Sequence, residues 1–318
     1  MPYAFDEFRR LVSKLPTPVS DRDPVVRYIC ALIAELAYYH VPQFEIDSKK
    51  RAMIVPCEGY RTIVARGVAT DIGVYLQGLD FPDAFVVVDR GVIAVGLLLN
   101  GLLFIGFRGT KFLFDWRINL RAPLVTVSSD FVRGPFRADY SRGRIHRGFA
   151  EEAVRISARI LDVLRDKGVT QVDHVFLAGH SLGGAVAALS ERLLRFDGLS
   201  TIVFGTPRYC DVSEYYTSLR GPPTQIARSG DIIPFVPPRS FGYADHPYEF
   251  NTSGTPVIRS FVQSSVPFFI WRLALFVGKF FEPHSMEMYR RELGIAASVP
   301  FSDKALAPYE TLTAAAVR

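Results

Sequence analysis

Residues 174–184 have the sequence His-Val-Phe-Leu-Ala-Gly-His-Ser-Leu-Gly-Gly. A short apolar strand pattern leads into the motif G-x-S-x-G, and a helical pattern of apolar side chains follows over residues 183–196. Glycines two residues before and after Ser181 leave room for a tight turn between the strand and the helix. Such a turn holds a serine hydroxyl above the edge of a sheet, beside the unpaired N–H groups of a helix start. The stretch therefore predicts Ser181 as a nucleophile and the amide of Leu182 as a donor to an oxyanion.

Strands and helices alternate on both sides of this turn. Further strands are predicted at residues 200–204 and 224–227, and a hairpin at residues 86–107 with its turn at Asn100-Gly101. One helix is predicted from Asp23-Pro24 through Leu36, and another from Phe149 to Gly168. This order predicts an α/β fold with a mostly parallel central sheet, helices on both faces and an N-terminal helical segment.

The composition fits one large domain. The chain has 318 residues, of which 49% are hydrophobic and 22% charged, so residues 1–318 can bury a single large core. The net charge is +5, and no run of basic residues interleaved with aromatic residues indicates a nucleic-acid partner. Three cysteines without a C-x-x-C spacing indicate neither a zinc site nor a disulfide framework. No apolar signal segment follows the N-terminus, so a cytoplasmic or peripheral membrane location is expected rather than Sec-dependent secretion.

A serine nucleophile needs a base, and the base needs a carboxylate that orients it. His246 and His284 are the histidines that follow Ser181, and we favour His284, which lies in a loop before a predicted C-terminal helix. Of the aspartates at 197, 211, 231, 245 and 303, Asp231 directly follows a predicted strand and lies at the carboxyl edge of the sheet. Asp231 is therefore the predicted acid.

Seven motifs in order resemble the fungal-type class 3 lipase family of the α/β-hydrolase superfamily. The resemblance covers roughly residues 104–290, whereas the N-terminal hundred residues carry no motif of the family. The motifs are Phe107-Arg108-Gly109-Thr110, Asp115-Trp116 with Asn119-Leu120, His146-Arg147-Gly148-Phe149, Gly179 to Gly184, Phe204-Gly205-Thr206-Pro207-Arg208, Asp231-Ile232-Ile233-Pro234 with Pro237-Pro238, and His284 with Tyr289.

The resemblance implies an α/β-hydrolase fold with a core at about residues 84–295 and an extension at residues 1–83 packed on it. It implies Ser181 as nucleophile, Asp231 as acid and His284 as base. It places Thr110 at the oxyanion hole beside Leu182, and it implies no metal or organic cofactor. The expected activity is hydrolysis of carboxylic esters of acylglycerols or similar lipids, as in a triacylglycerol lipase or carboxylesterase. A phospholipase A or an acyltransferase is the alternative, and a non-catalytic protein that binds membrane surfaces is a further one.

Two apolar clusters bear on the substrate. Phe112, Phe114 and Trp116 follow Thr110 directly and form either a lid or ordinary core. Residues 266–281, which include Phe268 and Trp271, precede His284 and form an acyl-binding wall, an element that docks on lipid surfaces or a buried helix. The expected partner is thus a lipid ester, with peripheral contact to lipid surfaces, and the oligomeric state is left open.

Overall fold

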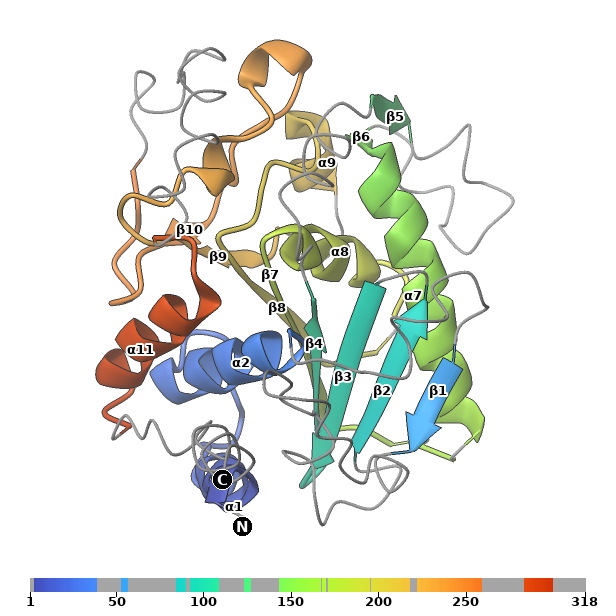
Figure 1. Cartoon of the computed structure of the whole chain (residues 1–318), viewed down its shortest axis with the longest axis vertical. Coiled ribbons are helices and arrows are strands. Elements are labelled where there is room, and N and C mark those ends of the chain that lie inside the picture. Colours follow the sequence, from blue (N-terminus) through green and yellow to red (C-terminus); the bar gives the residue numbers. More distant parts are fainter. Residues whose placement is uncertain are drawn as a thin grey trace, which may run out of the picture.

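The computed structural model describes 3–38, 53–56, 84–89, 92–108, 123–126, 143–166, 168–169, 171–194, 196–217, 222–258 and 283–299. Within these ranges the main sheet has eight strands in the order β1-β2-β3-β4-β7-β8-β9-β10 (Figure 1). Strands β1 to β4 pair antiparallel, and β4, β7, β8, β9 and β10 pair parallel. Their bounds are β1 Met53–Pro56, β2 Ala84–Asp89, β3 Val92–Leu99, β4 Leu102–Phe107, β7 His174–His180, β8 Leu199–Phe204, β9 Thr224–Ile226 and β10 Glu249–Phe250; β5 Leu124–Thr126 and β6 Arg144–His146 pair separately.

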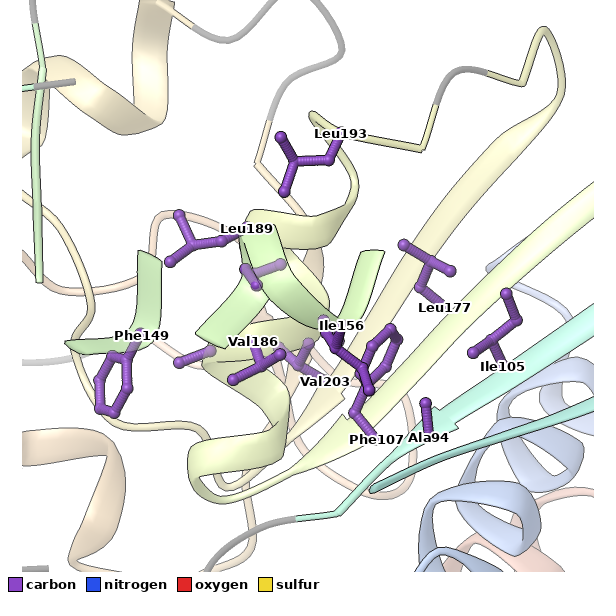
Figure 2. Close-up of a cluster of buried hydrophobic side chains, with 14 of the residues drawn as sticks. Ala94, Ile105, Phe107, Phe149, Ile156, Leu177, Val186, Leu189, Leu193 and Val203 are labelled. Atoms are coloured by element: carbon purple, nitrogen blue, oxygen red, sulfur yellow. The ribbon is translucent and has the colours of Figure 1, made fainter. Parts of the chain in front are cut away.

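Helices cover both faces of the sheet (Figure 1). Their bounds are α1 Tyr3–Val12, α2 Pro24–Leu36, α7 Arg147–Asp166, α8 Leu182–Ser190, α9 Val212–Thr217 and α11 Met286–Ala296, with short 3-10 turns at Ile233–Phe235 and Arg239–Phe241. Buried side chains of α1, α2 and α11 share one core with the sheet, and those of α7, α8 and α9 share the core on the opposite face. Figure 2 shows the second core, where Phe149 and Ile156 of α7 and Val186 of α8 pack near Leu177 and Val203 of the central strands. The predicted α/β fold with a mostly parallel central sheet is confirmed.

Local signals account for the ends of several elements. The carboxylate of Asp23 accepts a hydrogen bond of 2.7 Å from the amide of Val25, and Pro24 begins α2 as predicted. Asn100 and Gly101 take left-handed φ angles of 50° and 76°, which suits the tight hairpin turn between β3 and β4. The predicted helix at residues 183–196 is wrong in its length, because α8 ends at Ser190. There the amides of Leu193 and Leu194 both bond to the carbonyl of Ser190, so the chain turns back toward β8.

The N-terminal helix α2 is part of the core. It crosses strand β4 so closely that a Cβ at Gly106 would lie 2.3 Å from the carbonyl oxygen of Ile33. It also packs along α11, where Arg290 forms a buried ion pair with Glu35. That the whole of residues 1–318 forms one domain stays a prediction. In the described ranges, no helix is both long and apolar enough to cross a membrane.

Candidate active site

Ser181 occupies a strained turn between β7 and α8. Its φ of 58° and ψ of −131° are unusual for a residue with a side chain. Two hydrogen bonds hold this backbone, one of 2.9 Å from the amide of Ser181 to the carbonyl of Phe204 and one of 3.0 Å from the amide of Gly184 to the carbonyl of Ser181. Strand and helix come so close that a Cβ at Gly179 would lie 2.3 Å from the carbonyl oxygen of Gly183. This is the strand, turn and helix that the sequence predicts, with Ser181 only 3% exposed.

Asp231 and His284 form a buried pair although 53 residues separate them. Asp231 follows β9, and His284 lies just before α11. Nδ1 of His284 lies 2.8 Å from Oδ2 of Asp231, and the other carboxylate oxygen accepts a bond of 2.9 Å from the amide of Ile233. Asp231 is 3% exposed, and its carboxylate can only accept a hydrogen bond from Nδ1 of His284. It therefore fixes which ring nitrogen of His284 carries the proton.

Tyr289 supports the pair from α11. Its hydroxyl donates to Oδ2 of Asp231 over 2.6 Å and accepts from the amide of Arg228 over 3.0 Å. Burial, followed by the Asp231 charge, raises the pKa of Tyr289 well above its usual value, so the hydroxyl stays protonated and remains a donor. Arg228 also donates to the carbonyl of Pro283, directly before His284, over 2.6 Å. The sequence motif includes Tyr289 but does not reveal this contact with the carboxylate.

Gly205 links the serine turn to the pair. It follows Phe204, whose carbonyl holds the amide of Ser181, and its φ is +52°. A Cβ at Gly205 would lie 2.5 Å from Oδ2 of Asp231 and 3.0 Å from Nδ1 of His284. The end of β8 therefore brings the predicted nucleophile, acid and base to the same carboxyl edge of the sheet.

His180 and Tyr38 complete the surroundings of His284. The rings of His180 and His284 lie 4.4 Å apart, and Nδ1 of His180 lies 2.7 Å from the hydroxyl of Tyr38, just after α2. Burial, with a smaller contribution from His284, lowers the pKa of His180 well below its usual value, so this ring is neutral. Among the described residues, Nε2 of His180 makes no hydrogen bond of normal geometry. The main chain of His284 nevertheless lies close enough to favour the protonated form of the His180 ring. The motif around Ser181 contains His180, but the sequence gives no sign of its contact with Tyr38.

Some of the predicted site residues lie elsewhere or outside the described ranges. His246, the rival base, packs against Tyr215 with ring centroids 5.1 Å apart, and Asp245 pairs with Arg208 and Arg239. Leu182 begins α8, where the first amides have no partner within a helix, so its N–H is available beside Ser181. The residues outside the described ranges are Thr110, Phe112, Phe114, Trp116, Phe268 and Trp271.

The chain is similar to one known protein family and to several individual proteins. The family model described as Lipase (class 3) matches residues 104–241. A stretch of 127 residues is 29% identical to the secreted mono- and diacylglycerol lipase 1 of Fusarium solani and covers 38% of this chain and 38% of that protein. A stretch of 202 residues is 28% identical to phospholipase A1-II 4 of Oryza sativa subsp. japonica and covers 55% of this chain and 49% of that protein.

The matches thus span less than half the length of these two relatives. Among solved structures, the Lip2 lipase of Yarrowia lipolytica is 19% identical, with a TM-score of 0.47, and the alignment covers 71% of this chain and 77% of that one. The resemblance of the ordered motifs to the class 3 lipase family is confirmed by the family model that matches residues 104–241 and by the lipase relatives.

Proposed function

We propose that this protein is a serine hydrolase that cleaves carboxylic ester bonds through Ser181, His284 and Asp231. One observation carries the proposal. The buried pair of Asp231 and His284, joined at 2.8 Å, lies against the end of β8, and the carbonyl of Phe204 at the same strand end binds the amide of Ser181. A base that is oriented by a carboxylate and lies near a serine at a helix start is the arrangement that acyl transfer requires.

The reaction proceeds in two halves. Nε2 of His284 takes the proton of the Ser181 hydroxyl as its oxygen attacks the ester carbonyl, and a tetrahedral oxyanion forms. His284 then gives this proton to the leaving alcohol, and the acyl group stays on Ser181. Water attacks the acyl-enzyme in the second half, again through His284, and releases the carboxylic acid. Asp231 stabilises the imidazolium that forms in each half.

The amide of Leu182 would stabilise the oxyanion at the start of α8, with Thr110 as the second donor. The loss of one such donor typically raises the barrier by about 2.7–4 kcal/mol. No metal or organic cofactor takes part in this scheme.

Acylglycerols or similar lipid esters are the proposed substrates. The Fusarium relative is named a mono- and diacylglycerol lipase, which supports this choice. The rice relative is named a phospholipase A1, so hydrolysis of a phospholipid ester is the second candidate for the same site. Both use the same acyl transfer and differ only in the alcohol that leaves.

Turnover of p-nitrophenyl esters from acetate to palmitate by the wild type and by Ser181→Ala tests the chemistry. We expect the wild type to turn over and the variant to lose nearly all activity, and a fluorophosphonate to label only the wild type at Ser181. Equal activity of both proteins would refute the role of Ser181. A panel of a diacylglycerol and a phosphatidylcholine with matched acyl chains then separates the two substrate classes by their kcat/KM values.

A further inference from the structure

A second pocket lies away from the catalytic pair, between the start of α2, the end of α11 and the loop after β10. Its volume is about 400 Å³, within the range of small-molecule sites. Its wall combines the cations Arg22 and Arg27, the hydroxyl residues Thr252 and Ser253, and apolar side chains that include Phe250. Arg27 and Tyr38 are 11 residues apart along and just beyond α2, which corresponds to about 16 Å, so this pocket is distinct from the surroundings of His284.

Arg27 is the central group of the pocket. The residue is only 6% exposed, and its guanidinium carbon lies 4.9 Å from the centroid of the Phe250 ring. Its Nε donates to the carbonyl of Asp21 over 2.9 Å. Within the described part of the chain, the terminal nitrogens of Arg27 make no hydrogen bond or ion pair. The terminal nitrogens are not fully buried, so they reach the open space of the pocket, where an oxyanion could accept hydrogen bonds from them.

The acidic side chains around the pocket are already engaged with other donors. The carboxylate of Asp21 accepts from the hydroxyl of Thr224 over 2.8 Å, and that of Asp23 caps α2. Glu292, which bonds to the hydroxyl of Thr252, is paired with Arg228. Arg22 is exposed and, like Arg27, forms no ion pair among the described residues. Two cations therefore face one pocket, and no carboxylate of the described ranges is bound to either of them.

The electrostatics favour an added anion. Burial lowers the pKa of Arg27, the Asp21 charge opposes this effect, and the charge of Arg22 adds to it. An oxyanion between the two guanidiniums would relieve their repulsion and supply the missing acceptors. Phe250, Pro24 and Leu293 offer apolar surface beside the cations, which an inorganic ion alone would leave uncovered.

We propose that this pocket binds an amphiphilic anion, with its oxyanion head on Arg27 and Arg22 and a short apolar chain against Phe250 and Leu293. A free fatty acid and a monoalkyl phosphate share this chemistry. Nothing in the proposed ester hydrolysis requires the pocket, so the two proposals stand or fall separately.

Calorimetric titration of the full-length Ser181→Ala protein with decanoate and with decyl phosphate tests the proposal without any turnover, and decanol serves as the uncharged ligand with the same chain. We expect Arg27→Gln to weaken binding of the anion by about tenfold or more, the usual cost of one charge-assisted hydrogen bond. Arg22→Gln should weaken it by about a few-fold, since Arg22 is exposed. Arg165→Gln, on the exposed end of α7, is the matched control and should leave affinity unchanged.

The comparison of the two anions identifies the preferred head group, carboxylate or phosphate. A fatty chain bound at the proposed acyl site does not use Arg27, so a loss on Arg27→Gln isolates this pocket. Three results would overturn the proposal: neither anion binds, Arg27→Gln binds as the parent does, or decanol binds as tightly as the anions. If Arg27→Gln does not fold, Arg22→Gln decides, because its side chain is exposed and unchanged affinity in that variant contradicts the proposal.

Discussion

A single methyl group added at Gly205 should disable the site while the protein stays folded. The Cβ of Gly205→Ala would lie 2.5 Å from Oδ2 of Asp231, 2.9 Å from the hydroxyl of Tyr289 and 3.0 Å from Nδ1 of His284. Real Cβ atoms need more than 3 Å from such oxygens, so the carboxylate and the imidazole must move apart. A displacement of about 1 Å in a catalytic group can cost about 100-fold in rate. We therefore expect kcat/KM for a short p-nitrophenyl ester to fall by about 100-fold.

The effect of the backbone can be separated from that of the contact. Gly205 has a φ of +52°, where an alanine costs roughly 1–2 kcal/mol of folding stability. Gly168, after α7, has a φ of +67°, but apart from its chain neighbours none of the described residues has an atom within 4 Å of its would-be Cβ. Gly168→Ala should thus lose only the backbone contribution of about 1–2 kcal/mol from the free energy of unfolding measured with urea, and it should keep its activity. Wild-type kcat/KM in a folded Gly205→Ala protein would refute the proposed arrangement of acid and base.

Three further measurements address the surroundings of the site. Tyr38→Phe removes the hydrogen bond to His180, worth about 1 kcal/mol, and should lower kcat about fivefold with little change in KM; a changed KM with an intact kcat would contradict a positioning role. Burial keeps the pKa of His180 well below 6.5, so the unfolded state binds a proton on this ring more readily than the folded state does. The free energy of unfolding should therefore fall as the pH drops below about 6.5. In urea titrations at several pH values, His180→Gln should flatten this dependence. Arg290→Met leaves Glu35 buried without its partner and should lower the free energy of unfolding by about 3–5 kcal/mol. Arg291→Met breaks an exposed pair and should lower it by less than about 1 kcal/mol. Equal losses in the two variants would show that the buried pair stabilises the fold no more than the exposed one.

Features whose geometry is determined by neighbours along the chain can be predicted from the sequence. The turn at Ser181 depends on glycines within a few residues, and the start of α2 depends on Asp23 and Pro24. The hairpin at Asn100-Gly101 is equally local, because two left-handed residues in succession dictate the turn. Each of these features follows from the conformational preferences of a short segment.

The missed features depend on contacts between distant segments. Tyr38 and His180 are 142 residues apart, and no periodicity or spacing relates them. Tyr289 meets Asp231 only because α11 packs beside the end of β9. α8 is shorter than the sequence predicts, because apolar residues after Ser190 continue the helical pattern although the chain turns toward β8 there. Tertiary packing decides these points, and a single sequence does not display it.

The segment that matches the family does not contain all residues of the proposed catalytic site. Residues 104–241 hold Ser181 and Asp231, but His284 and its support Tyr289 lie after this segment, and Tyr38 lies before it. These outer parts are fixed to each other by the pairing of Glu35 in α2 with Arg290 in α11, close to the start of the helix that follows the base. Because a base must be held within a fraction of an ångström to work, we expect α2 to help position the proposed base His284 as well as to fill the core. The described part of the N-terminal segment, which carries no family motif, therefore contributes a contact beside the proposed active site.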